Sequence, residues 1–186
     1  YAERHRASKA CCLGRTRSRV TRRCDPTRSL YNRSHAAPGT QDHVNRPKRI
    51  LIVKLSALGN MVLSMGPFAA IRAHHPDAEI AVLTTPPYAG WLAAAPWFDR
   101  VITGGRPAWW DFAGLHRLWR ALRDGGFDRV YDMQTSGRSS RYFRFFPSNA
   151  RPEWCGIAKG CSHPHRLPPG TWMHDIDRQY DQLKAA

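Results

Sequence analysis

Four residues near one predicted strand-to-helix junction are of the types that bind or activate a ligand: Lys54, Ser56, Gly59 and Asn60. Lys54 and Ser56 offer a cation and a hydroxyl, and Gly59 allows the backbone to turn tightly and to approach a ligand closely. A helix that begins here leaves unpaired N–H groups that attract anions. The junction contains neither the dinucleotide fingerprint nor the phosphate loop of nucleotide-binding proteins. Taken alone, it indicates an anion-binding turn and a junction without function equally well.

The elements around this junction predict an α/β fold. Residues 49–55 are a nearly continuous apolar run, as a central parallel strand requires. Residues 60–75 have approximately helical apolar spacing, with a kink or a restart expected at Pro67. Further strands are predicted at 79–85, 100–103 and 128–134, and further helices at 88–95, 110–123, 136–146 and 173–184. Between residue 147 and the last helix we expect only turns. This alternation predicts a Rossmann-like, doubly wound parallel sheet.

The positive charge of the chain is concentrated near its beginning. The chain has 29 Lys/Arg and 14 Asp/Glu residues, a formal charge of +15. Residues 1–49 hold 13 basic and 3 acidic residues (+10), which leaves 16 and 11 (+5) for residues 50–186. Residues 1–47 have almost no apolar periodicity, so we expect a disordered basic tail. An organelle transit peptide and a nucleic-acid-binding segment are the alternatives for this tail.

The cysteines indicate neither a disulfide framework nor a metal site. Their number is odd and three of the five lie in the predicted tail, which favours a reducing, cytoplasmic setting. Cys155, Cys161, His163 and His165 are able to bind zinc, but their spacing matches no usual structural-zinc pattern. Ordinary loop residues are the favoured interpretation, and we predict no metal and no cofactor.

Several segments, taken in order, resemble glycosyltransferase family 9, the bacterial heptosyltransferases of lipopolysaccharide inner-core synthesis. They are RILIVKLSALGN (49–60), PWFDRVI (96–102) and FDRVYDMQTS (127–136). Between the first two, the sequence from Pro67 follows the pattern P-x-A-x-I-R-A-x-x-P-x-A-x-I-x-x-L to within a shift of one residue. GCSHPH (160–165) and HDIDRQYDQL (174–183) also look like the linker and helix that lead into the second domain of that family. The resemblance covers about residues 49–186 and excludes the tail.

The resemblance implies the amino-terminal half of a GT-B fold. Residues 48–186 would form the Rossmann-like acceptor-binding domain, and the donor-binding domain would begin about where this chain ends. The implied reaction is an inverting, metal-independent transfer of heptose from ADP-heptose to a lipid-linked core oligosaccharide. The implied place is the cytoplasm, at the inner face of the inner membrane, with peripheral membrane contact.

The resemblance also gives position 60 a chemical role. In the family, an acidic residue after the glycine of the first turn is thought to deprotonate the acceptor hydroxyl, and its counterpart here is Asn60. A carboxamide has no useful basicity and only orients a partner through hydrogen bonds. We therefore expect this chain alone to be inactive as a transferase.

An acceptor that carries carboxylates and phosphates needs basic and polar groups at the rim of its site. Arg106 follows the third predicted strand, Gln134 ends the fourth and Arg138 comes after it, so all three belong to the sheet edge that carries Asn60. With Lys54, Ser56 and Gly59, they are the residues that we expect to bind the acceptor. Solvated arginines without a ligand are the alternative for Arg106 and Arg138.

Two further points stay open on the residues alone. The aromatic residues Trp91, Trp97, Phe98, Trp109, Trp110 and Trp119 favour core packing over a sugar platform, although Trp109 and Trp110 fit an exposed, membrane-facing position as well. A competing function is a Rossmann-like module that binds nucleic acid or a partner through its basic tail. A non-catalytic remnant that binds the acceptor without turnover is a third possibility.

Overall fold

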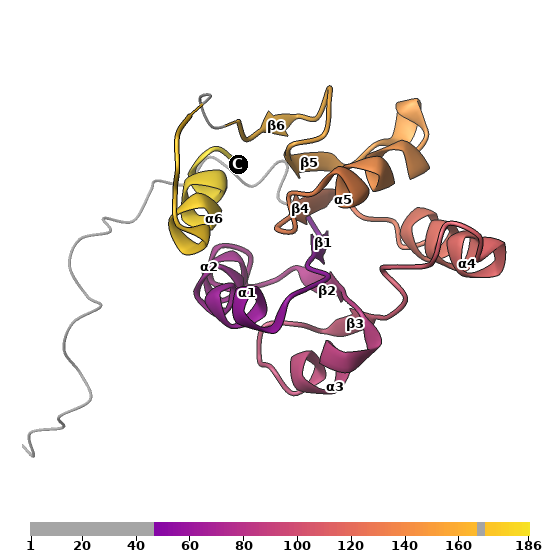
Figure 1. The fold of residues 1–186 in the computed structure, drawn as a ribbon, viewed down its shortest axis with the longest axis horizontal. Helices are drawn as coiled ribbons and strands as arrows, with labels where there is room; N and C mark the ends of the chain where they lie inside the picture. Colours follow the sequence, from indigo (N-terminus) through magenta and orange to yellow (C-terminus); the bar gives the residue numbers. More distant parts are fainter. Residues whose placement is uncertain (1–46, 167–169) are drawn as a thin grey trace, which may run out of the picture. The chain divides into compact units, whose positions relative to one another are not determined.

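The computed structural model describes residues 47–166 and 170–186, and these residues form a six-stranded sheet with helices on both faces (Figure 1). The strand order is β3-β2-β1-β4-β5-β6, and every neighbouring pair is parallel. The predicted α/β, doubly wound parallel sheet is thus confirmed. The predicted disordered tail, residues 1–47, lies outside the described residues except for Pro47.

The strands and helices follow one another in the alternation that the sequence predicts. The strands are β1 (Arg49–Val53), β2 (Glu79–Leu83), β3 (Arg100–Ile102), β4 (Arg129–Asp132), β5 (Glu153–Gly156) and β6 (His163–Pro164). The α-helices are α1 (Leu58–Leu63), α2 (Met65–His74), α3 (Pro86–Ala93), α4 (Phe112–Arg123), α5 (Gly137–Tyr142) and α6 (Asp175–Lys184). Two short 3₁₀ helices, η1 (Phe143–Phe145) and η2 (Ser148–Ala150), follow α5.

Alternate residues of the central strand β1 enter two separate hydrophobic cores, because successive side chains of a strand point to opposite faces. Leu51 and Val53 pack with residues of α4, α5 and η1, whereas Ile50 and Ile52 pack with residues of α1, α2 and α3. Figure 1 shows α1, α2 and α6 on one side of the sheet and α4 and α5 on the other. The strand is therefore buried on both faces, which explains its nearly continuous apolar sequence.

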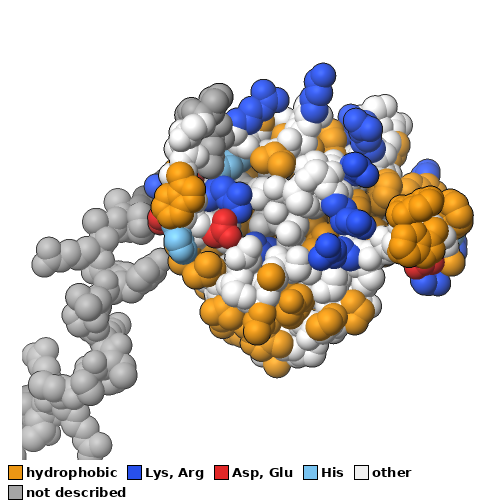
Figure 2. Space-filling view, in the orientation of Figure 1, with side chains coloured by type: hydrophobic (Ala, Val, Ile, Leu, Met, Phe, Trp, Pro, Cys, Tyr) orange, Lys and Arg blue, Asp and Glu red, His pale blue; other side chains and the backbone are white. Residues whose placement is uncertain are grey.

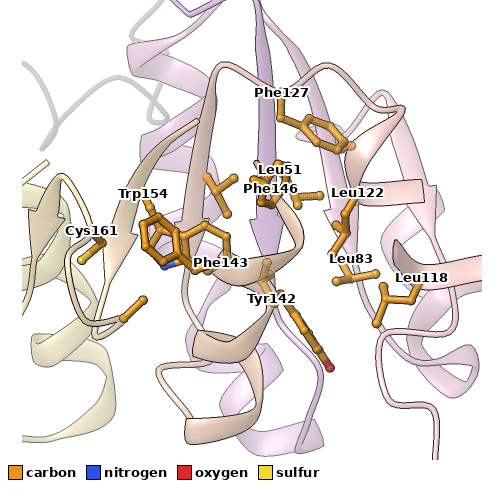
Figure 3. Close-up of a cluster of buried hydrophobic side chains, with 14 of the residues drawn as sticks. Leu51, Leu83, Leu118, Leu122, Phe127, Tyr142, Phe143, Phe146, Trp154 and Cys161 are labelled. Carbon is orange, nitrogen blue, oxygen red and sulfur yellow. The ribbon is translucent and has the colours of Figure 1, made fainter. Parts of the chain in front are cut away.

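The core on the α4 and α5 side is built around aromatic rings (Figure 3). Trp154 of β5 is fully buried and lies edge-on to Phe143 and Phe146, with ring centroids 5.5 and 6.3 Å apart. Leu118 and Leu122 of α4 complete the same core. Trp154 is not among the aromatic residues that the sequence singled out. Of those that it did, Trp97 and Phe98 pack against the other core, whereas Trp109 and Trp110 are exposed.

The predicted helix over 60–75 is interrupted, as expected near Pro67. It consists of α1 and α2, which meet at Ser64. Pro67 is the third residue of α2, in the first turn, where a backbone N–H has no partner within the helix. Proline is compatible with this position, so the chain restarts its helix there.

The expectation of turns alone after Pro147 is wrong, because β5 and β6 lie in that segment. β5 has only four residues and β6 only two, too few to show a period in the sequence. β5 is fixed by tertiary contacts instead: Trp154 is buried, and Glu153 pairs with Arg129 of β4. Short strands at one side of a sheet depend on such contacts more than on local pattern.

Candidate functional site

The candidate site lies at the carboxyl edge of the sheet, where the strand order reverses between β1 and β4. Ligands of open α/β sheets bind at such a reversal, in the crevice beyond the carboxyl ends of the strands. The segments 54–57 and 133–136 follow these two strands directly. They contain three of the predicted site residues, Lys54, Ser56 and Gln134, so the topology brings the predicted site together from two distant parts of the sequence.

Lys54 lies beneath this edge. Its side chain is 3 % exposed, and its Nζ donates a hydrogen bond of 3.0 Å to the carbonyl oxygen of Met133. Its backbone N–H donates to Leu83 O of β2, also at 3.0 Å. Burial lowers the pKa of Lys54 to about 8, against the opposing attraction of Asp175. Lys54 thus connects the segments that follow β1 and β4, and its charge is not displayed at the surface.

Gln134 connects the same two segments from the opposite direction. Its Oε1 accepts hydrogen bonds from the backbone N–H groups of Leu55 and Ser56, at 2.8 and 3.2 Å. Thr135, the next residue, has a φ of 45°, a left-handed backbone conformation that is uncommon for a residue with a side chain. The amide oxygen of Gln134 therefore orients the backbone of the first loop, which leaves only its NH₂ group for a ligand.

Two predicted arginines contact loops at this edge of the sheet. Arg106 Nη1 lies 3.4 Å from Ser56 Oγ, and Arg138 Nη1 donates to Pro107 O at 2.9 Å. Both arginines are exposed. Beside them is a cavity of about 570 Å³, lined in part by Arg106, Arg117 and Thr85. The structure thus brings Ser56, Arg106 and Arg138 to one rim, with both guanidinium groups facing solvent.

Gly59 and Asn60 lie in the first turn of α1, three and four residues after Ser56 of this rim. Asn60 is partly exposed, and its backbone carbonyl accepts a hydrogen bond from Ser64 Oγ at 2.6 Å. Gly59 does not have a positive φ, and a Cβ placed there would meet no atom within 4 Å. The backbone at Gly59 therefore does not use the left-handed conformation that glycine favours. Close approach of a ligand to this bare backbone stays a prediction.

Asp132 is a buried carboxylate that the sequence interpretation passed over as an ordinary strand residue. It ends β4 with no exposed surface; Ser139 Oγ donates to its Oδ2 at 3.0 Å, and Thr135 N donates to its Oδ1 at 3.2 Å. Gln182 of α6 donates to its backbone carbonyl at 3.0 Å. Burial raises the pKa of Asp132 to about 7, although both hydrogen bonds oppose the shift. The sequence does contain a sign of this burial, because Asp132 directly follows Val130 and Tyr131 within a predicted strand.

Asp132→Asn is expected to make the protein more stable near pH 7.5 and to change its stability little near pH 4. A carboxyl whose pKa is raised on folding binds a proton more tightly in the native state than in the unfolded state. The free energy of unfolding of the wild type therefore falls as the pH rises from about 4 to 7. A shift of roughly three pKa units corresponds to at most about 4 kcal/mol. Urea unfolding at several pH values up to 7.5 measures it. Asp77→Asn, in an exposed turn, controls for the loss of one charge, and parallel curves for wild type and Asp132→Asn would contradict the expectation.

The four zinc-capable residues are packed among β5, β6 and α6. Cys155 Sγ donates to Gln182 O at 3.4 Å, and His165 Nε2 lies 2.9 Å from Asp181 Oδ2. Across residues 47–166 and 170–186, no group of three or more His, Cys, Asp or Glu side chains is arranged to hold a metal ion. No helix in the same two segments has both the length and the apolar character needed to cross a bilayer.

Comparison with characterised proteins agrees with the family resemblance in the sequence. No family model matches the chain. A curated relative, the lipopolysaccharide core heptosyltransferase OpsX of Haemophilus influenzae, is 27 % identical over 94 residues. That match covers 50 % of this chain and 26 % of the relative. No comparison supports the alternative of a nucleic-acid-binding module.

Solved structures of glycosyltransferase family 9 proteins and heptosyltransferases share the fold of this chain. A glycosyltransferase family 9 protein from Veillonella parvula superposes with a TM-score of 0.62 at 20 % identity, over 74 % of this chain and 40 % of that protein. The heptosyltransferase WaaC of E. coli, with ADP-2-deoxy-2-fluoro heptose, gives 0.56 at 18 % identity, over 73 % and 47 %. The ADP-heptose heptosyltransferase II of E. coli gives 0.57 at 21 % identity, over 72 % and 39 %. This chain thus spans less than half of each, and the fold predicted from the resemblance is confirmed.

Proposed function

We propose that residues 48–186 act as the acceptor-binding half of a heptosyltransferase related to glycosyltransferase family 9. The acceptor would be the lipid-linked core oligosaccharide, and the donor would be ADP-heptose. The observation that carries the proposal is the rim formed by Ser56, Arg106 and Arg138 at the point where the strand order reverses. The heptosyltransferases with the same fold, and the curated relative, support the choice of substrate class.

The rim has the groups that an anionic sugar requires. Guanidinium groups form short, paired hydrogen bonds with carboxylates and phosphates, and the arginines here are exposed rather than occupied by an acid. Arg106 donates toward Ser56 and Arg138 donates to a backbone carbonyl, so each is oriented while keeping donors free for a ligand. Lys54 and Gln134 hold the two loops beneath, so their role in this proposal is to position the rim.

In this proposal the described domain binds and orients the acceptor but does not activate it. Inverting transfer needs a base within hydrogen-bond reach of the attacking hydroxyl. The side chain at the family's base position is the amide of Asn60, which is able to hold a hydroxyl but unable to take its proton. The described residues also form a single Rossmann-like sheet, so the donor-binding wall of the cleft would have to come from another domain.

The double variant Arg106→Gln, Arg138→Gln is expected to weaken binding of a deacylated core oligosaccharide bearing carboxylates and phosphates by at least about tenfold. Each hydrogen bond to a charged group is worth roughly 1.5–3 kcal/mol, and both arginines would lose their charge. Isothermal titration calorimetry measures the change. Arg120→Gln with Arg123→Gln is the matched control, because it removes the same two charges from exposed residues that do not line the cavity. Equal affinities for the double variant and the control would overturn the proposed acceptor site.

A further inference from the structure

Three large apolar side chains lie exposed where the loop after β3 enters α4. Trp109, Trp110 and Phe112 expose 76 %, 65 % and 76 % of their surface, and we call them the aromatic loop. The two indole rings contact each other edge-on, with centroids 5.4 Å apart. Figure 2 shows an apolar cluster over α4 with basic side chains beside it. Exposed aromatic side chains grouped in this way mark an interaction surface, because covering them with a partner would remove apolar surface from water, which is favourable.

The aromatic loop is held in place by its own backbone. Asp111 caps α4: its Oδ1 accepts from Gly114 N at 2.8 Å, and its backbone N–H donates to Ala108 O at 3.0 Å. Arg138 fixes the start of the loop through Pro107 O. The aromatic rings are thus presented to solvent by an anchored turn, so their exposure is a property of the fold.

The elements around the aromatic loop carry a strong positive charge. Residues 104–124 and 137–146 together contain seven arginines and two aspartates, a net charge of +5. All seven arginines are exposed: Arg106, Arg117, Arg120, Arg123, Arg138, Arg141 and Arg144. The two segments are adjacent, because α4 contacts η1. One of the two aspartates, Asp111, is already engaged in capping a helix.

We propose that the aromatic loop and the surrounding arginines dock on a membrane surface that contains anionic lipids. Tryptophan rings favour the level of the lipid headgroups, where one end of the ring is apolar and the other is hydrated. Arginines beside them are attracted to the negative surface potential of such a membrane. A protein partner would be expected to meet a groove or a surface with balanced charge, whereas this surface is an exposed apolar cluster beside seven arginines and only two aspartates. The proposal goes beyond acceptor binding and holds whether or not the chain takes part in sugar transfer.

The geometry also relates this surface to the cavity. Ala108 and Asp111 of the same loop line the cavity of about 570 Å³, together with Arg106 and Arg117. A loop that rests on a bilayer would therefore bring the mouth of the cavity close to the lipid headgroups. An acceptor that carries its own lipid anchor would meet the cavity without leaving the membrane.

Flotation of the full 186-residue chain with lipid vesicles tests this surface. The vesicles consist of phosphatidylcholine with about a third phosphatidylglycerol, and the salt is raised to about 0.5 M to screen binding through the basic residues 1–49. Trp109→Ser with Trp110→Ser is expected to reduce the floating fraction at least about fivefold. Trp172→Ser is the matched control, because Trp172 is 86 % exposed and lies outside the aromatic loop. Thermal unfolding of each variant confirms that the fold is intact.

The contribution of charge is tested at low salt. Arg141→Gln with Arg144→Gln is expected to weaken binding to these vesicles severalfold, whereas Lys48→Gln with Lys184→Gln removes the same charge elsewhere and is expected to have less effect. Unchanged flotation of the tryptophan double variant would overturn the proposal. So would concentration-dependent self-association that the tryptophan variant abolishes while flotation stays at the wild-type level, because a second copy of the chain would then be the partner.

Discussion

Asn60→Asp, introduced into a chimera of this chain with the donor-binding domain of a family 9 heptosyltransferase, is expected to raise heptose transfer by about 10²–10⁴-fold. That range is what a positioned general base contributes to proton transfer. Asn60 is partly exposed in the first turn of α1, four residues after Ser56 of the rim that Ser56 forms with Arg106 and Arg138. A carboxylate at the same place would differ from the amide in one respect that matters here, its ability to accept a proton.

The measurement is the rate of ADP release from ADP-heptose in the presence of acceptor. Asn60→Ala in the same chimera removes the side chain without adding a base, and it should leave the low rate of the unsubstituted chimera unchanged. Binding of ADP by the chimera shows independently that its donor half is folded. If the Asn60→Asp chimera binds both substrates and yet transfers no faster than the Asn60→Ala chimera, the role assigned to position 60 is wrong.

Trp154→Ala is expected to cost about 3–5 kcal/mol of the free energy of unfolding. The indole is completely buried and packs edge-on against Phe143 and Phe146 (Figure 3). Deletion removes its transfer free energy and leaves a cavity that the surrounding rings fill only in part. Because small domains have only about 5–15 kcal/mol in total, the variant should unfold at a much lower urea concentration.

Two substitutions make the result for Trp154 specific. Trp172→Ala removes an indole that is 86 % exposed and should change the stability by less than about 0.5 kcal/mol. Trp154→Phe keeps most of the ring volume, and it removes an indole N–H that has no hydrogen-bond partner among the described residues. It should therefore cost much less than alanine. Equal losses for Trp154→Ala and Trp172→Ala would show that the β5 core is not needed for stability.

The elements that could be predicted from the sequence are those with a long, regular pattern of apolar residues. β1 is buried on both faces and appears as an unbroken apolar run, and α4 has an apolar stripe that ends at Gly125 and Gly126. β5 was not predicted, because its four residues are an acid, a tryptophan, a cysteine and a glycine, which show no strand pattern. Their burial depends on contacts with β4 and η1 rather than on their neighbours in sequence. No local pattern contains that information.

For the candidate site, the sequence predicted which loops come together better than it predicted where individual side chains point. The expected loops do meet at the carboxyl edge, and Ser56, Arg106 and Arg138 share one rim. Lys54 illustrates the limit: its residue type suggests an exposed cation, but the structure buries it and directs its Nζ to Met133 O. Which way a lysine points depends on partners 79 positions away, and spacing along the chain does not reveal them.

The central place of β1 has a consequence for how the protein is made. β1 is the first of the described strands to leave the ribosome, yet one of its two neighbours is β4, and the contact between Lys54 and Met133 spans 79 residues. At a synthesis rate of about 5–20 residues per second, β1 waits roughly 4–16 s for that neighbour. β2 arrives earlier and covers only one edge. During translation the other edge of the most apolar strand is therefore open to pairing with other chains until β4 has been made.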